Sequence, residues 1–204
     1  MSRIVHPIET QSYHILRSTV DTTHLTQHAR DVAERIVHTT ADPQWVEELL
    51  LDETALAAGA AALRAGAPLV VDVMMVAAGI TAYPSICGLD AAAASDGLTR
   101  TAAGIRHAAE RAADGAVWAI GNAPTALVEL LRLCADGTVR PALIVGLPVG
   151  FVGAVEAKAT LRAAGLPQLS NRSAKGGAAV AAAAVNALLY GDPLATDEPR
   201  REHP

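Results

Sequence analysis

Short apolar runs alternate with helix-like segments through most of this 204-residue chain, and this alternation constrains the fold more than any other feature. The runs lie at 69–73, 85–89, 116–121, 142–146 and 166–170 and contain few polar residues. Strands of this kind are buried on both faces, as in a parallel sheet covered by helices. The sequence therefore predicts an α/β fold with three layers, α/β/α, around a mainly parallel sheet of about five strands.

Helical patterns fill the intervals between these runs, at 99–113, 124–135, 153–164 and 177–190. Two more helices are expected ahead of the sheet. The first, 27–38, has apolar residues at amphipathic spacing, and the second, 44–64, is followed by Gly66 and Pro68, a common stop signal. We expect one domain over residues 1–190 and a flexible, charged, Pro-rich tail at 191–204.

The composition excludes several classes of protein. A formal net charge of −5 gives no general attraction to a polyanion, so we expect no nucleic-acid partner. The most apolar stretch, GGAAVAAAAVNALLYG, is too short and too rich in Ala to span a membrane. Cys87 and Cys134 are far apart without metal-ligand spacing, and the N-terminus lacks the apolar core of a secretory signal. These features predict a cytoplasmic protein that needs no metal.

His38 is the titratable residue with the strongest case for chemistry. It falls at the predicted C-terminal end of the helix 27–38, where partial negative charge favours imidazolium. Glu34, one turn earlier, is expected to push in the same direction. A histidine that titrates near neutrality can donate a proton at cytosolic pH. The alternative is a histidine that only caps the last carbonyls of its helix.

Other candidate residues lie where predicted parallel strands end, the edge at which open α/β sheets bind ligands. Asp72 and Asn122 follow two of these strands, and either side chain could instead start a helix. Gly146 and Gly150 belong to the turn GLPVGFVG, whose glycine spacing differs from a dinucleotide fingerprint. Lys175, in NRSAKGG, joins basic groups, a diglycine and a helix start in a candidate anion-binding nest.

Six segments together resemble the precorrin-8X methylmutase family of cobalamin biosynthesis. They appear in the family's order over residues 12–187, and two of them, AIGNAPTAL and PALIVGLPVGFVGAVEAK, are far more specific than a glycine motif alone. The other four are IVH, VDVMMVAAGIT, TRTAAG and KGGAAVAAAAVNAL. The resemblance implies a homodimeric α/β/α protein with substrate pockets near the subunit interface and no cofactor.

The resemblance also implies an activity and a set of site residues. The family moves a methyl group between adjacent carbons of pyrrole ring C, which converts precorrin-8X to hydrogenobyrinic acid. By the same resemblance His38 is the catalytic histidine, and the substrate contacts are Ser12, Arg17, Thr81 and Arg100. We interpret His38 as the donor of a proton to a ring nitrogen, because protonation gives the electron-deficient ring system that methyl migration needs.

Three questions stay open from the sequence. The substrate is either metal-free or its cobalt complex. The glycine turn either receives a substrate carboxylate or packs against the macrocycle, with Met75 among the apolar residues that fit a broad flat ligand. The alternative function is a non-catalytic tetrapyrrole carrier of the same pathway; in either case the product could pass to the next enzyme.

Overall fold

The computed structural model describes residues 5–89, 97–112 and 114–195. These residues form a six-stranded sheet in the order β1-β6-β5-β4-β2-β3, parallel except for β1, which pairs antiparallel with β6. The strands are β1 (Leu49–Leu51), β2 (Leu69–Val71), β3 (Ser85–Cys87), β4 (Val117–Ile120), β5 (Leu143–Gly146) and β6 (Gln168–Asn171). The mainly parallel sheet is confirmed, and each of the five predicted runs overlaps a strand.

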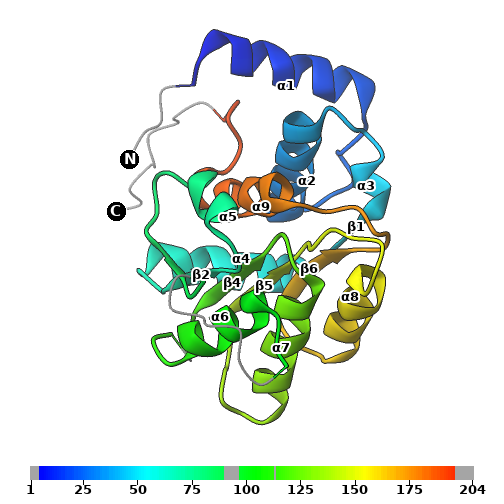
Figure 1. The fold of residues 1–204 in the computed structure, drawn as a ribbon. Coiled ribbons are helices and arrows are strands. Elements are labelled where there is room, and N and C mark those ends of the chain that lie inside the picture. The colour runs from blue at the N-terminus through cyan, green and yellow to red at the C-terminus, as the bar shows by residue number, and fades with distance from the viewer. Residues whose placement is uncertain (1–4, 90–96, 113, 196–204) are drawn as a thin grey trace.

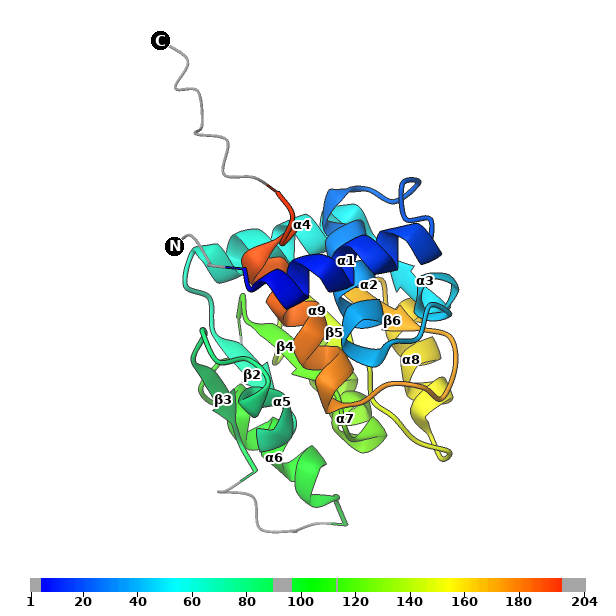
Figure 2. The ribbon, with the colours of Figure 1, turned by 90° about the horizontal axis from the view of Figure 1, so that it is seen from above.

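Helices cover both faces of the sheet (Figure 1). On one face lie α2 (Gln27–Thr40), α4 (Glu53–Arg64), α5 (Met74–Ala78) and α9 (Ala178–Tyr190), and on the other α6 (Arg100–Ala109), α7 (Pro124–Ala135) and α8 (Ala154–Ala163). Two clusters of buried apolar side chains fill the two interfaces, so the predicted three layers are confirmed. A further helix, α1 (Pro7–Thr19), lies outside the layer of α2 and α9 (Figure 2).

The segment 44–64 differs from the single helix expected there. It contains the short helix α3 (Trp45–Glu48), then β1, then α4. The three leucines of β1 pair with β6, and Asp52 starts α4 by accepting a hydrogen bond from the amide of Ala55. The prediction was wrong because a run of leucines suits a helix and an edge strand equally well, and only pairing with β6 decides between them.

The end of the chain is also partly ordered. Asp192 accepts a hydrogen bond from the amide of Leu194 and forms an ion pair with Arg17 of α1 at 2.9 Å. The first residues of the predicted tail therefore contact the body of the protein. Residues 196–204 lie outside the described residues, so their predicted flexibility stays a prediction.

Candidate active site between α1 and α2

His38 and Ser12 meet where α1 crosses α2. The Ser12 Oγ lies 2.8 Å from Nδ1 of His38, and the Tyr13 ring stacks on the imidazole with centroids 4.9 Å apart. Tyr13 is fully buried, so it fixes the plane of the imidazole while the Ser12 hydroxyl fixes its rotation. Two residues named as site residues from separate segments of the sequence are thus in direct contact.

A cavity of about 210 Å³ opens beside this pair. His38 and Ser12 line it together with apolar side chains, and Ala41 and Pro43, in the turn that follows α2, form another part of its wall. Ligand pockets usually measure roughly 300–1,000 Å³. The cavity in one chain is therefore large enough for part of a broad ligand, and the remainder has to lie outside it.

The position of His38 at the end of α2 agrees with the sequence prediction. The helix ends at Thr40, and Ala41 has a left-handed backbone, with φ of 53°, while its amide donates to the carbonyl of Val37. His38 lies in this last turn and is half-buried. The structure thus places the imidazole at the end of a helix, as the sequence indicated.

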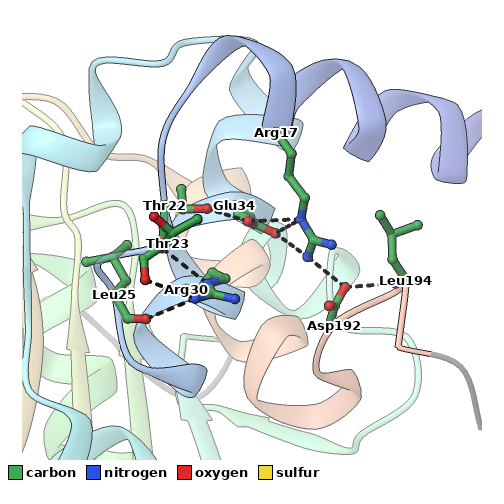
Figure 3. Close-up of polar contacts among 8 residues, drawn as sticks. All are labelled: Arg17, Thr22, Thr23, Leu25, Arg30, Glu34, Asp192 and Leu194. Carbon is green, nitrogen blue, oxygen red and sulfur yellow. Dashed lines mark hydrogen bonds and ion pairs between the residues drawn. The ribbon is translucent and has the colours of Figure 1, made fainter.

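Glu34 has a different role from the one expected. It is only 1% exposed, and its carboxylate accepts hydrogen bonds from Arg17 at 2.8–3.1 Å and from the Thr22 hydroxyl at 2.6 Å (Figure 3). Arg17 also forms an ion pair with Asp192, and the hydrogen bond that it donates to Glu34 is the main reason that the pKa of Arg17 rises. Arg17 therefore offsets the negative charge of Glu34.

Arg17 does not line the His38 cavity. It lines a separate cavity of about 500 Å³ with residues 18–23, Arg30 and Glu34. Arg30 is held at that cavity by donating to the carbonyls of Thr22, Thr23 and Leu25 (Figure 3). Within the described chain, Arg17 is thus engaged by two carboxylates.

Asp72 lies between the ends of β2 and β4, where the strand order reverses and α/β proteins commonly bind ligands. It is 2% exposed and accepts hydrogen bonds from the amides of Gly121, Asn122 and Ala123 at 2.8–3.1 Å. Burial raises the pKa of Asp72, and these three donors oppose that rise. The contacts fit a structural role, but Asp72 fixes the segment that leads into α7 and not the start of α5, which directly follows it in the chain. The Asn122 side chain is exposed.

The glycine turn presents apolar side chains to the surface. Gly146 is buried at the end of β5, where a Cβ would collide with Leu161, so close packing explains this glycine. Gly150 has φ of 153° and donates its amide to the carbonyl of Ala174. Phe151 and Val152, which follow it, are 104% and 88% exposed. The turn thus offers an apolar edge.

The remaining predicted contacts are dispersed over neighbouring elements. Met75 is 70% exposed on α5, and Thr81 is exposed in the loop that follows. Arg100 is the exposed first residue of α6, whose capping Thr99 lies 2.7 Å from the Thr125 hydroxyl at the start of α7. Lys175 donates to Asp42 at 2.8 Å and to Gln44 at 2.9 Å, so its ammonium is engaged by the turn after α2.

Sequence reasoning missed two residues that shape this region. Tyr13 stacks on His38. The segment QSYHILR does not predict this contact, because it depends on the crossing of α1 over α2. Lys158, on α8, is completely buried. The sequence did not predict this burial, because a lysine in an amphipathic helix is usually exposed. Among the described residues there is no cluster of three or more metal-ligating side chains and no helix that could cross a bilayer.

Comparison with known proteins gives one consistent family. The family model described as "CbiC: Precorrin-8X methylmutase" matches residues 7–191. A precorrin-8X methylmutase of Pseudomonas aeruginosa is 41% identical, covering 87% of this chain and 91% of the relative. A cobalt-precorrin-8 methylmutase of Methanocaldococcus jannaschii is 39% identical, covering 78% of this chain and 77% of the relative.

A solved structure supports the same fold. The precorrin-8X methylmutase from Thermus thermophilus superposes with a TM-score of 0.80 at 32% sequence identity, covering 89% of this chain and 93% of that one. The family match extends from the start of α1 to the end of α9. It therefore covers both the crossing of α1 over α2 and the whole sheet.

Proposed function

Because the chain belongs to the precorrin-8X methylmutase family, we propose that it is the isomerase that moves a methyl group between adjacent carbons of ring C of this tetrapyrrole. The observation that carries the proposal is the contact of Ser12 with His38 beside an open cavity. The relatives are named methylmutases, and nothing in these comparisons favours the carrier alternative.

His38 acts as the proton donor in this proposal. Its imidazolium gives the Nε2 proton to a ring nitrogen of the substrate, the methyl group migrates to the neighbouring carbon, and the imidazole takes a proton back. The product is an isomer, so no atom is gained or lost. Ser12 suits this cycle because a hydroxyl can either accept from Nδ1–H or donate to Nδ1, so it can hold the ring in both protonation states.

The substrate extends beyond the cavity of about 210 Å³ and covers neighbouring parts of the protein. Arg100 and Thr81 meet its carboxylates, while exposed apolar residues such as Met75 and Phe151 of the glycine turn pack against the macrocycle. Arg17 contacts the substrate only if a carboxylate of the substrate replaces Asp192, the more exposed of its two partners.

Two copies of the chain form the active protein in this proposal. Ile8 and Ile15 on α1 are 70% and 58% exposed, and Ile15 lines the His38 cavity, so a second chain over α1 would bury apolar surface and enlarge the site. We place the protein in the cytoplasm, where it could hand its product to the enzyme that follows.

The test is conversion of precorrin-8X, followed by absorbance, with wild-type protein and with His38→Ala. His24→Ala is the matched control, because His24 is an exposed histidine outside α1 and outside the His38 cavity. We expect His38→Ala to lose at least 10²-fold in kcat, the usual size of acid catalysis, and to keep product affinity. Full turnover in that variant would rule out the acid role.

The same assay with cobalt-precorrin-8 decides between the two substrates. Relatives named for either substrate are similarly identical to this chain, at 40% and 39%, so the comparison of kcat/KM has to decide. Product binding without turnover of either substrate by the wild-type protein would instead support a carrier.

A further inference from the structure

Lys158 is a buried lysine for which the proposed reaction has no role. It is 0% exposed, and its ammonium donates to the Asn171 side chain and to the carbonyls of Ser173 and Lys175 at 2.5–2.8 Å. All three acceptors are neutral, and burial lowers the pKa of Lys158 to about 8. An ammonium held in this way is costly unless every proton is bonded, so its contacts define a precise local geometry.

The segment that Lys158 holds connects β6 to α9. Its far side is fixed to the turn after β5, because Gly150 donates its amide to the carbonyl of Ala174 and Gly177 donates to the carbonyl of Leu147. Gly176 has φ of 155°, and a Cβ there would meet the backbone oxygens of Leu147 and Pro148. The connection thus has little freedom to move.

Lys175 connects this segment to the turn that follows α2. Its Nζ donates to Asp42 at 2.8 Å and to Gln44 at 2.9 Å, and it lies 6.0 Å from the centre of the Trp45 ring. Asp42 stands between Ala41 and Pro43, the two residues by which this turn forms part of the wall of the His38 cavity. Contacts between named atoms therefore run without a gap from the core of α8 to that wall.

We propose that Lys158 and Lys175 are positioning residues: Lys158 fixes the connection before α9, and Lys175, through Asp42, fixes the turn that sets His38 and its cavity. The inference rests on the proposed function for its kinetic readout. It assigns Lys175 a task within the protein, in place of a direct grip on a substrate carboxylate.

Lys175 could either position the turn or bind the substrate, and the two roles predict different effects of Asp42→Asn on kcat and KM. If Lys175 positions the turn, Lys175→Met and Asp42→Asn break the same contact, and each lowers kcat about tenfold with KM changed by less than about threefold. The double variant is then no worse than either single one. Lys175→Arg, which keeps the charge, recovers most of the rate.

If Lys175 instead grips the substrate, Lys175→Met raises KM while Asp42→Asn leaves KM unchanged or lowers it, which would overturn the proposal. Unchanged kcat in both variants, or effects that multiply in the double variant, would also overturn it. Arg132→Met is the matched control: it removes an exposed cation bonded to Glu129 and Asp136 on α7, on the other face of the sheet, and is expected to keep wild-type kcat.

A measurement without substrate separates this inference from the proposed function. The ring signals of His38 in NMR spectra, assigned with His38→Gln, should shift in Lys175→Met, Asp42→Asn and Lys158→Met but stay in place in Arg132→Met. If Lys158→Met does not fold, the two variants at the partly exposed Lys175 and Asp42 decide the question. If the wild type turns over neither form of precorrin-8X, the proposed function fails and these signals alone decide. His38 signals that stay in place in Lys175→Met and Asp42→Asn contradict the positioning role.

Discussion

The Oγ of Ser12 lies 2.8 Å from Nδ1 of His38, although 26 residues separate them in the chain. This contact joins α1 to the C-terminal turn of α2 and orients the imidazole toward an open cavity. Because the imidazole must present one nitrogen to the substrate, its orientation is as important for proton transfer as its pKa.

Ser12→Ala tests the contact directly. We expect kcat to fall about tenfold, the rate equivalent of roughly 1.4 kcal/mol, because the ring loses its partner at Nδ1. Ser12→Thr keeps the hydroxyl and should retain more activity. Steady-state kinetics on precorrin-8X provides the measurement, with Ser18→Ala, an exposed serine of the same helix, as control. A kcat for Ser12→Ala equal to that of the wild type would contradict the orienting role.

The ion pair of Arg17 with buried Glu34 should stabilise α1 on α2. Arg17→Met leaves a carboxylate that is 1% exposed without its cation, and we expect a loss of about 3–5 kcal/mol in the free energy of unfolding. The double variant Arg17→Met/Glu34→Gln should lose less than the single variant, because no buried charge is left unpaired. Urea unfolding measures both, and a larger loss in the double variant would contradict this account.

Glu53 should make stability depend on pH in the acidic range. Burial by itself would raise its pKa, but hydrogen bonds from Thr26, His28 and Ala29 outweigh burial and lower it from 4.5 to about 2. A carboxyl group whose pKa is lower in the folded state stabilises the fold above its unfolded pKa. That contribution is lost as pH falls from about 4.5 to about 2.

The measurement is urea unfolding of Glu53→Gln beside the wild type. Glu53 caps the start of α2, because it accepts hydrogen bonds from the amides of His28 and Ala29. At pH 7 we therefore expect the variant to be less stable by about 1 kcal/mol, the usual contribution of a helix cap. The difference should shrink between pH 4.5 and pH 2. Glu47→Gln, at an exposed glutamate, is the control and should match the wild type throughout. A constant difference at every pH would show that the carboxylate charge contributes nothing.

Asp72→Asn distinguishes a structural role from a ligand contact. The carboxylate accepts three backbone hydrogen bonds with two oxygens, and an amide, with one oxygen, cannot replace it. We expect unfolding to become easier by about 1–3 kcal/mol with a KM close to that of the wild type. Asn122→Ala, at an exposed neighbour, should leave stability unchanged. A raised KM with unchanged stability would instead show that Asp72 meets the substrate.

Local patterns explain why so much of the fold was predictable. The continuous apolar runs marked every parallel strand, and the spacing of Val32, Ile36 and their neighbours marked α2 with His38 at its end. The helix at 124–135 was predicted to the residue, because Pro124 fits the first turn of a helix. These signals are local: burial and backbone preference act on each segment wherever it packs.

Those local patterns could not predict contacts between segments that are distant in the sequence. The helix α1 was not expected, and β1 was taken for part of a helix, because neither has a sequence pattern that excludes the alternative. The hydrogen bond of Lys175 to Asp42 joins residues 133 positions apart, and no pattern in either segment predicts the other as its partner. Glu34 shows the same limit, since its cation comes from α1 rather than from its own helix.

The sequence by itself determined the parallel strands, the place of His38 at a helix end and, through its motifs, the family. Only the tertiary structure decided which side chains meet: Ser12 with His38, Arg17 with Glu34, and Lys175 with Asp42. The physical reason is that periodicity records which face of an element is buried. Its partner is fixed by the crossing of whole helices and by hydrogen bonds that form only after the layers have packed.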